Sequence, residues 1–353
     1  MPPIFKNLTR SRRKGATCLY YCKSIMFLTC TSLFFMLAKL NLILCIFRNV
    51  IMLNFLPSGL LGVIAGLLLV VNVLIWTSLL FVFAILKFLL PLPPLRRVFN
   101  WILHRIVENW VACNSGWMRL TQKTRWDVQG LEGLNYDGWY LVVSNHQSWV
   151  DILVMQHLLN RRIPLLKFFL KRELIRVPVM GLAWWALDFP FLHRHGAEYL
   201  KKHPEQKGKD FETMRRACEK FAYIPTSVMN FLEGTRFTEA KHDQKKGEYK
   251  FLLRPKSGGL ALALNVLGDK FNSLLDITII YPDGIPTFWE FICGKVKRII
   301  VRVQTIEIPK KFLHGDYEGD PVFRDDMHKW VQQLWQEKDR QIESLRKKAG
   351  TVE

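Results

Sequence analysis

The chain has 353 residues, half of them hydrophobic, which allows one large domain or two modest ones and makes a membrane segment worth seeking. Its formal net charge of +20 suits a partner that carries phosphate, either nucleic acid or an anionic membrane surface, and the apolar N-terminal third favours the membrane. The seven cysteines are scattered and include no C-x-x-C pair, which argues against a disulfide framework and a zinc site.

An uncharged apolar segment runs from Gly59 to Leu86. A helix needs roughly 20 apolar residues to cross the hydrocarbon core of a bilayer, so this segment predicts a transmembrane helix. A buried core helix is the alternative, but uncharged runs of this length rarely form one. The basic residues that follow are Lys87, Arg96, Arg97 and Arg105. Such a cluster marks the cytoplasmic side, so we expect the rest of the chain to be cytoplasmic.

The first 51 residues allow more than one interpretation. A second apolar stretch, Ile25–Phe47, is interrupted by Lys39 and Asn41, and it crosses the membrane, lies on it or acts as a signal-like segment. Met52 begins a run that reads naturally as a protein start, so the extension is either genuine or an artefact of the assigned start. The expected parts are therefore an uncertain extension at 1–51, a transmembrane helix with a proline-rich linker at 52–97, and a folded domain at 98–353.

Short apolar runs alternate with helical patterns after Pro91, Pro93 and Pro94, which we expect to end the membrane helix. A tryptophan-rich amphipathic helix is predicted first, at 98–122. The predicted strands are Trp139–Ser144, Ser227–Phe231, Asp276–Tyr281 and Arg298–Gln304. The other predicted helices are Asp151–Leu159, Asp210–Phe221, Gly258–Leu267 and 325–347. This alternation predicts an α/β fold, in which one or two transmembrane helices precede a mixed sheet covered by helices on both faces.

A histidine and an aspartate stand where the first predicted strand passes into a helix. The stretch Ser144–Asp151 reads S-N-H-Q-S-W-V-D, with five residues from His146 to Asp151. This spacing fits a histidine in the turn and an aspartate in the first helical turn, where the carboxylate holds one imidazole nitrogen and leaves the other as a base. Imidazole ordinarily titrates at about pH 6.5, which suits removal of a proton from an attacking hydroxyl. Taken alone, a turn histidine beside a helix-capping aspartate is the simpler explanation.

Three further sequence blocks follow in order. They are Phe191-Leu192-His193-Arg194, Phe231-Leu232-Glu233-Gly234-Thr235-Arg236, and a strand end at Tyr281-Pro282. With the first block they resemble the 1-acylglycerol-3-phosphate acyltransferase family of PlsC-type enzymes, also called lysophosphatidate acyltransferases. The likeness covers most of residues 98–350 and is strongest to the bacterial YihG-type branch and the eukaryotic lysocardiolipin acyltransferase-like branch. It implies a glycerolipid acyltransferase domain at 98–353.

The resemblance implies a role for the residues of each block. His146 and Asp151 take the place of the catalytic pair, and Arg194 that of an arginine that binds the acceptor phosphate, a task suited to the guanidinium fork. The residues that would shape the acceptor site are Glu233, Gly234, Thr235 and Arg236. Glu233 is expected to brace Arg236 or Arg194 rather than to touch phosphate, because like charges repel.

Two residue assignments implied by the resemblance have weaker support than the others. Lys171 stands where relatives often carry a basic residue near the acceptor phosphate, although a membrane-facing basic patch explains it equally well. Pro282 stands near the position where the family binds the acyl chain, although a proline at a strand end is also common for structural reasons. His193 and His195 lack an evident third ligand, so no metal is implied.

The implied reaction is direct acyl transfer from an acyl thioester, either acyl-CoA or acyl carrier protein, to the free hydroxyl of a lysophospholipid. The expected acceptor is 1-acyl-sn-glycerol-3-phosphate, which gives phosphatidic acid, and no cofactor is expected beside the thioester co-substrate. The chain has no G-x-S-x-G elbow, and Ser144 and Ser148 flank His146 without such a setting, which counts against a serine hydrolase.

Other interpretations remain open at this stage. The acceptor could be glycerol phosphate, lysocardiolipin, another lysophospholipid or a lipid A precursor, and the chain could be a catalytically silent membrane scaffold. Nucleic-acid binding is disfavoured, because no recognisable module is present and the basic residues cluster near the apolar segment. The expected partners are membrane lipid, the lysophospholipid and the thioester, at a bacterial inner membrane with the catalytic domain on the cytoplasmic side.

Overall fold

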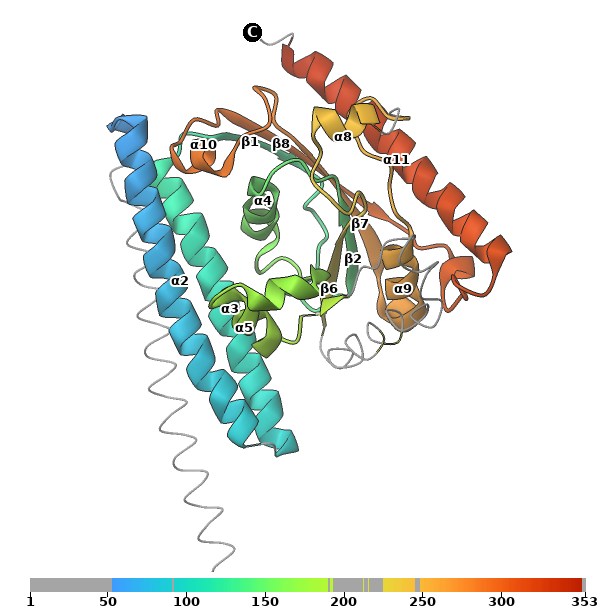
Figure 1. Ribbon diagram of the computed structural model, residues 1–353, viewed down its shortest axis with the longest axis horizontal. Coiled ribbons are helices and arrows are strands. Elements are labelled where there is room, and N and C mark those ends of the chain that lie inside the picture. The colour runs from blue at the N-terminus through green and yellow to red at the C-terminus, as the bar shows by residue number, and fades with distance from the viewer. Residues whose placement is uncertain are drawn as a thin grey trace, which may run out of the picture. The chain divides into compact units, whose positions relative to one another are not determined.

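The computed structural model describes residues 53–90, 92–189, 191–192, 212, 215, 225–244 and 248–350. The extension at 1–51, with its second apolar stretch, lies outside these residues, as does nearly all of the helix expected at Asp210–Phe221. Figure 1 shows the described part as a pair of long helices beside a helix-covered sheet.

The apolar segment forms α2 (Ser58–Leu89), which follows a short 3-10 helix at Leu53–Phe55. Within the described part of the chain, α2 is the one helix long and apolar enough to cross a membrane. Its exposed apolar residues include Leu60, Val63, Leu67, Val70, Val71, Leu74, Ile75, Val82 and Ile85. This exposure is unlike a core helix, whose apolar side chains are mostly buried.

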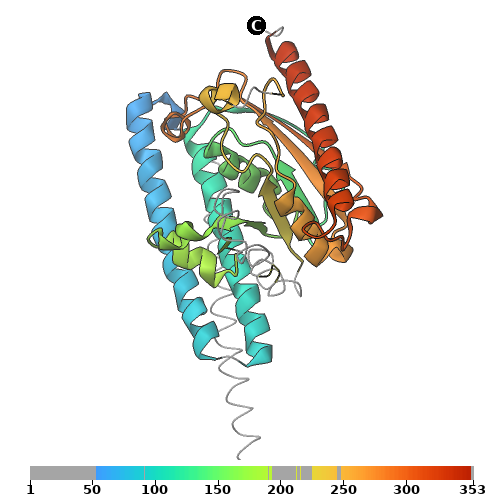
Figure 2. The same cartoon turned by 45° about the vertical axis from the view of Figure 1, so that its right-hand side comes forward.

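A second long helix, α3 (Pro93–Thr121), lies side by side with α2 in both views (Figures 1 and 2). Inside this pair the buried Asn72 donates a hydrogen bond to Oδ1 of Asn114 at 2.8 Å. Pro93 and Pro94 stand in the first turn of α3 rather than in a linker, because the first helical turn does not need their missing N–H groups.

Six strands form the main sheet in the order β1-β8-β7-β2-β6-β3. They are β1 (Arg125–Gln129), β2 (Tyr140–Ser144), β3 (Leu166–Phe168), β6 (Ser227–Phe231), β7 (Ser273–Ile280) and β8 (Arg298–Ile306). All neighbours are parallel except β7 and β8, which confirms the predicted mixed sheet. The four predicted strands are present, whereas β1 and β3, at the two edges, were not predicted.

Helices cover both faces of this sheet, as predicted. On one face α4 (Val150–Leu159), the end of α3 and α10 (Phe288–Ile292) pack on residues such as Val142. On the other face α9 (Gly258–Leu267) and α11 (Pro321–Gly350) pack on residues such as Val143. Neighbouring residues of β2 therefore point to opposite faces, and both faces are apolar because both are buried.

The remaining elements lie beside this core. A small parallel sheet joins β4 (Leu170–Lys171) to β5 (Phe191–Leu192). The other helices are α5 (Met180–Ala186), α8 (Glu239–Gln244) and 3-10 turns at Arg172–Arg176, Gly268–Lys270 and Lys310–Phe312.

The parallel arrangement of three central strands determines where a site can form. Ser144, the last residue of β2, is in register with Phe231, the last residue of β6, and β2 also runs parallel to β7. The segments that leave these strands therefore meet at one edge of the sheet, where open α/β sheets usually bind ligands. Figure 1 shows α8 and α10 at this same end of the sheet.

Candidate active site

His146 lies in the segment between β2 and α4, and Asp151 is the second residue of α4. Nδ1 of the histidine is 2.9 Å from Oδ2 of the aspartate, which is fully buried. The predicted local arrangement, a turn histidine above a carboxylate in the first helical turn, is therefore present. Because a carboxylate accepts, Nδ1 carries the proton and Nε2 keeps its lone pair.

The Asp151 carboxylate is held by three further donors. Oδ2 accepts the backbone N–H groups of Gln147 at 2.6 Å and Ser148 at 2.9 Å, and Oδ1 accepts the Tyr281 hydroxyl at 2.7 Å. Burial, and secondly the neighbouring carboxylate, raise the pKa of Tyr281 well above its ordinary value, so the phenol remains a donor. Tyr281 follows the last residue of β7 and was not among the predicted site residues, although it stands directly before Pro282.

The imidazole ring is also fixed from its face. It stacks on Phe231 with ring centres 3.9 Å apart and planes 14° apart. The described residues supply no hydrogen-bond partner for Nε2, and the side chain is 12% exposed. An oriented imidazole with one nitrogen available is the geometry that a general base requires.

Glu233 connects the loop after β2, which contains His146, to the segment that contains Leu253. Its Oε1 accepts the backbone N–H of His146 at 2.9 Å, and its Oε2 accepts that of Leu253 at 3.1 Å. Burial is the largest influence on the carboxyl and raises the pKa of Glu233 to about 8. The expected brace of an arginine is not seen for Arg236, whose guanidinium instead lies 4.8 Å from the centre of the Trp149 ring.

The segment after Glu233 makes a tight turn beside His146. Gly234 has a φ of +68°, and its N–H donates to Phe231 O at 2.9 Å. The chain then returns, so that Phe237 N donates to His146 O at 2.7 Å. The Glu233 side chain and the Phe237 N–H therefore bond to the N–H and the carbonyl of His146, respectively. These two bonds hold the turn next to the histidine.

The other predicted residues have different settings. Lys171 lies in β4 of the small sheet with an exposed side chain, and Pro282 follows Tyr281 at the edge of the main sheet. Arg194, His193 and His195 lie outside the described residues. Within the ranges that the structure describes, no group of three or more His, Cys, Asp and Glu side chains is arranged to hold a metal ion.

Both serines that flank His146 are buried, and their hydroxyl groups donate hydrogen bonds to backbone carbonyls. Ser144 Oγ donates to the Asn145 carbonyl at 3.0 Å, and Ser148 Oγ donates to the Pro286 carbonyl at 2.6 Å. Neither hydroxyl donates to the imidazole, which is the contact that a serine nucleophile needs.

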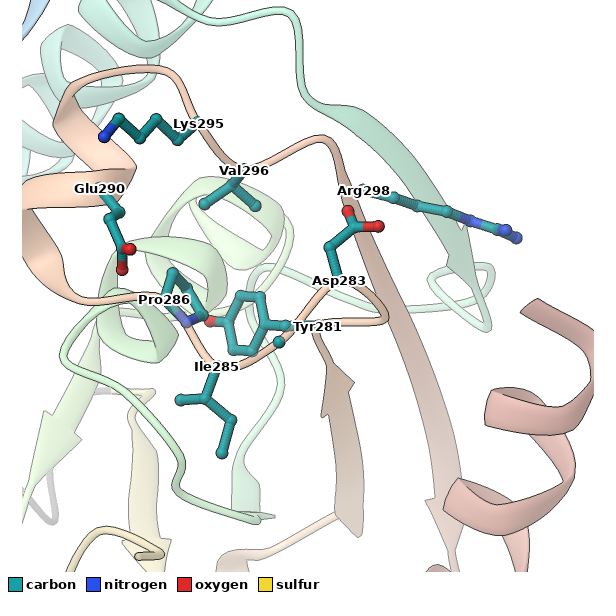
Figure 3. Close-up of a pocket in the computed structure, with 9 residues that line it drawn as sticks. Tyr281, Asp283, Ile285, Pro286, Glu290, Lys295, Val296 and Arg298 are labelled. Carbon is teal, nitrogen blue, oxygen red and sulfur yellow. The ribbon is translucent and has the colours of Figure 1, made fainter. Parts of the chain in front are cut away.

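A cavity of about 140 Å³ lies beside Tyr281, between the loop after β7 and the start of β8 (Figure 3). Asp283, Glu290 and Lys295 are among its lining residues. Arg298 extends away from Tyr281 in Figure 3 and forms a salt bridge with Asp127 at 2.9 Å. The charged walls and small volume do not suit an acyl chain.

Comparison with known proteins adds an independent observation. Residues 125–282 match the family model described as Acyltransferase. Lysocardiolipin acyltransferase 1 of Danio rerio is 26% identical over 261 residues, which cover 69% of this chain and 62% of that protein. The 1-acyl-sn-glycerol-3-phosphate acyltransferase delta of Homo sapiens is 28% identical over 211 residues, which cover 56% of this chain and 51% of that protein.

The chain thus spans less than two thirds of the length of these relatives. Among solved structures, the 1-acyl-sn-glycerophosphate acyltransferase PlsC from Thermotoga maritima aligns with a TM-score of 0.46 and 17% identity, over 78% of this chain and 97% of that one.

Proposed function

We propose that this chain, whose residues 125–282 match the family model described as Acyltransferase, transfers a fatty acyl group from an acyl thioester to the free hydroxyl of a lysophospholipid. The observation that carries the proposal is the bond from His146 to the buried Asp151 at the edge where β2, β6 and β7 end. The matched region, 125–282, contains both residues.

In this reaction Nε2 of His146 takes the proton of the acceptor hydroxyl while its oxygen attacks the thioester carbonyl carbon. The C–S bond breaks, the ester bond forms, and the imidazolium returns its proton to the leaving thiolate. Asp151 holds the Nδ1 proton and stabilises the imidazolium, as a buried carboxylate does in other histidine-based sites. General-base assistance of this kind contributes about 10²–10⁴-fold.

Direct transfer is favoured over an acyl-enzyme intermediate. The only serines that flank His146 use their hydroxyl groups on backbone carbonyls, so a nucleophile would first have to break a buried hydrogen bond. The attacking oxygen is therefore taken to be that of the acceptor itself.

The favoured acceptor is 1-acyl-sn-glycerol-3-phosphate, with its phosphate at the turn formed by Gly234, Thr235 and Arg236. A lysocardiolipin-like acceptor is the second candidate, because a relative with that name aligns over more of this chain. Arg194 is expected to contribute from outside the described residues. Acyl-CoA and acyl carrier protein both suit the donor role, and Pro282 is the proposed neighbour of the acyl chain.

Membrane attachment is proposed to depend on α2. An apolar helix of 32 residues with an exposed surface suits an acceptor and a product that both reside in a bilayer. The basic residues after α2 favour a cytoplasmic catalytic domain. A bacterial inner membrane and YihG-type specificity belong to the same proposal.

The test compares membranes that contain the wild type, His146→Ala or His314→Ala, supplied with acyl-CoA or acyl carrier protein and a panel of lysophospholipids. We expect His146→Ala to lower thiol release and diacyl product by about 10²–10⁴-fold. His314 is the matched control, because it is 53% exposed and bonds to Asp269 away from the site. Equal activity in all three samples, or a stable acyl adduct on Ser144 or Ser148 by mass spectrometry, would overturn the mechanism.

A further inference from the structure

Two tryptophans and an isoleucine lie close to the loop that contains His146, and the proposed mechanism uses none of them. Trp149 immediately precedes α4, Ile285 lies in the loop after β7, and Trp289 lies in α10. All three side chains are exposed. Large apolar side chains that gather at a surface indicate a place where another protein or a membrane binds. We call these three residues the apolar rim.

A hydrogen bond holds the apolar rim next to the candidate site. Ser148 Oγ donates to the Pro286 carbonyl at 2.6 Å, and this bond is buried. It joins the segment that contains Trp149 to the loop that contains Ile285. Because Ser148 is two residues after His146, the loop after β7 is attached close to the proposed base.

The helix α10 connects the apolar rim to α2. Thr287 and Glu290 form a capping box, which fixes the start of α10. The helix packs against one end of α2 (Figure 1). A Cβ added at Gly62 of α2 would lie 3.3 Å from Cη2 of Trp289 and would collide with the Cys293 side chain. The missing side chain of Gly62 therefore lets Trp289 pack on α2.

The exposed apolar surface of α2 begins at this same contact. Leu60 and Val63, on either side of Gly62 in the sequence, are exposed. At the other end of α2, Lys87 forms a salt bridge with Asp188 at 3.0 Å. Both ends of α2 are thus attached to the domain that contains the candidate site. A bilayer that takes up the exposed face of α2 therefore also meets the apolar rim.

The charges around the apolar rim favour a bilayer over a protein as the partner. The Arg236 guanidinium lies 4.8 Å from the centre of the Trp149 ring, and both Asp283 and Lys295 are exposed. In Figure 3 the Ile285 side chain extends away from Lys295. The core of a protein interface is depleted in charged residues, whereas tryptophan beside charged groups is typical of the headgroup region of a membrane.

We propose that Trp149, Ile285 and Trp289 enter the headgroup region of the bilayer, so that a lipid acceptor passes from the membrane to His146 without crossing water. Tryptophan suits this position, because its ring is apolar and its indole N–H can bond to a headgroup. The proposal rests on the proposed function for the identity of the acceptor. It adds a surface that loads the site and is distinct from the anchor α2.

The kinetic test uses the full-length chain in phosphatidylcholine vesicles, as wild type, Trp289→Ser or Ile285→Ser, with an acyl thioester that the wild type uses. The acceptor is either 1-oleoyl-sn-glycerol-3-phosphate, which resides in the bilayer, or the water-soluble 1-butyryl-sn-glycerol-3-phosphate. We expect both variants to lower the rate with the bilayer acceptor by about tenfold, because the apolar contact with the bilayer is lost. The rate with the soluble acceptor should stay within about twofold of the wild type, since exposed side chains contribute little to the fold.

The matched control is Trp185→Ser. Trp185 lies in α5 and is similarly exposed, but α5 is followed by the Asp188 that bonds to Lys87, at the other end of α2. Its ratio of the two rates should equal that of the wild type. Flotation should find every variant on the vesicles, because α2 is unchanged. An unchanged ratio in both rim variants, or an equal change in Trp185→Ser, would overturn the proposal.

A second arm does not depend on turnover. Ile285 is replaced by p-benzoylphenylalanine, the reconstituted protein is irradiated, and mass spectrometry identifies what is attached at that position. Val322, exposed at the start of α11, is replaced in the same way as the control. We expect phosphatidylcholine to be attached at position 285 and not at position 322. Attachment of a second copy of the chain, or of no lipid, would overturn the proposal.

The two proposals fail in different ways. If lipid is attached at position 285 but the wild type transfers no acyl group to either acceptor, the proposed function is wrong and the membrane contact of the apolar rim stands. If the wild type transfers acyl groups, the rim variants keep its ratio of rates and no lipid is attached at position 285, the apolar rim is not a membrane contact and the proposed function stands.

Discussion

At the scale of single residues, the site is organised around His146, which is held from four directions. Its N–H donates to Glu233, its carbonyl accepts from Phe237, its Nδ1 bonds to Asp151, and its ring stacks on Phe231. These contacts leave Nε2 as the nitrogen available for chemistry. If His146 is the base, as proposed, this fixed position means that little entropy is lost when the reacting hydroxyl arrives.

The raised pKa of Glu233 predicts how stability depends on pH. Its value shifts from an ordinary 4.5 to about 8, so between these values the folded protein keeps a proton that the unfolded chain has lost. The free energy of unfolding should therefore fall as pH rises through this window, by up to about 1.4 kcal/mol per pH unit. Glu233→Gln should flatten that slope, as measured by denaturant unfolding of detergent-solubilised protein.

The control for this experiment is Glu343→Gln. Glu343 is half-exposed, and its hydrogen bond with Lys250 lowers the pKa of its carboxyl, so it titrates below the window. Its replacement should leave the slope unchanged. A slope that persists in Glu233→Gln would show that another group titrates there.

The contact of His146 with Asp151 could be predicted, because both residues lie within five positions of one strand-to-helix junction. Tyr281 is 130 residues from Asp151, and its contact depends on β7 lying beside β2.

At the scale of elements, α11 supports the loops of the candidate site from outside the matched region. Asp339 accepts the N–H groups of Lys250 at 2.9 Å and Phe251 at 2.8 Å, and the buried Trp335 donates to Leu253 O at 3.0 Å. Leu253 N in turn bonds to Glu233. Hydrogen bonds therefore connect α11 through one loop to the carboxyl group that holds His146.

This connection predicts that a change in α11 alters catalysis. Asp339→Ala removes the acceptor of two backbone N–H groups and should lower the free energy of unfolding by about 1 kcal/mol. It should also lower kcat several-fold, because Leu253 no longer holds Glu233 in a fixed position. Denaturant unfolding and initial rates on the same preparations measure both effects.

The matched control is Asp325→Ala on the same helix. Asp325 pairs with Lys329 at the surface, where ion pairs contribute little to stability. We expect wild-type kcat from this variant. If both variants showed the same kcat, α11 would have no special connection to the site.

The apolar pattern of the sequence also explains which helices and strands could be predicted. β6 and α9 have the predicted bounds, because each is an apolar run with clear ends. β1 is an edge strand that reads R-W-D-V-Q, and its Asp127 pairs with Arg298 and Arg302 of β8. Such a strand is half-exposed and charged, so no apolar pattern identifies it.

At the scale of the whole molecule, the apolar surface of α2 and the candidate site lie in separate parts of the described structure. The exposed surface of α2 is apolar along its length, and α3 lies beside α2 (Figure 2). The site lies at the edge of the sheet, between elements that are packed in the two buried cores. Changes to the exposed face of α2 should therefore act on membrane attachment and leave the fold intact.

The corresponding prediction concerns three exposed positions of α2. Replacing Leu67, Leu74 and Ile75 by lysine should lower the membrane-bound fraction, because each lysine at a helix centre costs about 2.5–3.5 kcal/mol on insertion. Sedimentation and flotation of cell membranes measure that fraction. Val322→Lys is the control, since Val322 is 74% exposed at the start of α11. An unchanged membrane fraction in the triple variant would exclude α2 as the anchor.

The link from α11 to Glu233 has a consequence for how the protein is made. Leu253 and Trp335 are 82 residues apart, and a ribosome adds roughly 5–20 residues per second. On the order of ten seconds therefore pass between synthesis of the loop that holds Glu233 and synthesis of the helix that supports this loop. During that interval His146 and Asp151 have already been made, while the loop that bonds to Glu233 still lacks its hydrogen bonds with α11. We therefore expect a chain that reaches the membrane before α11 is made to have lower activity than one in which α11 has formed.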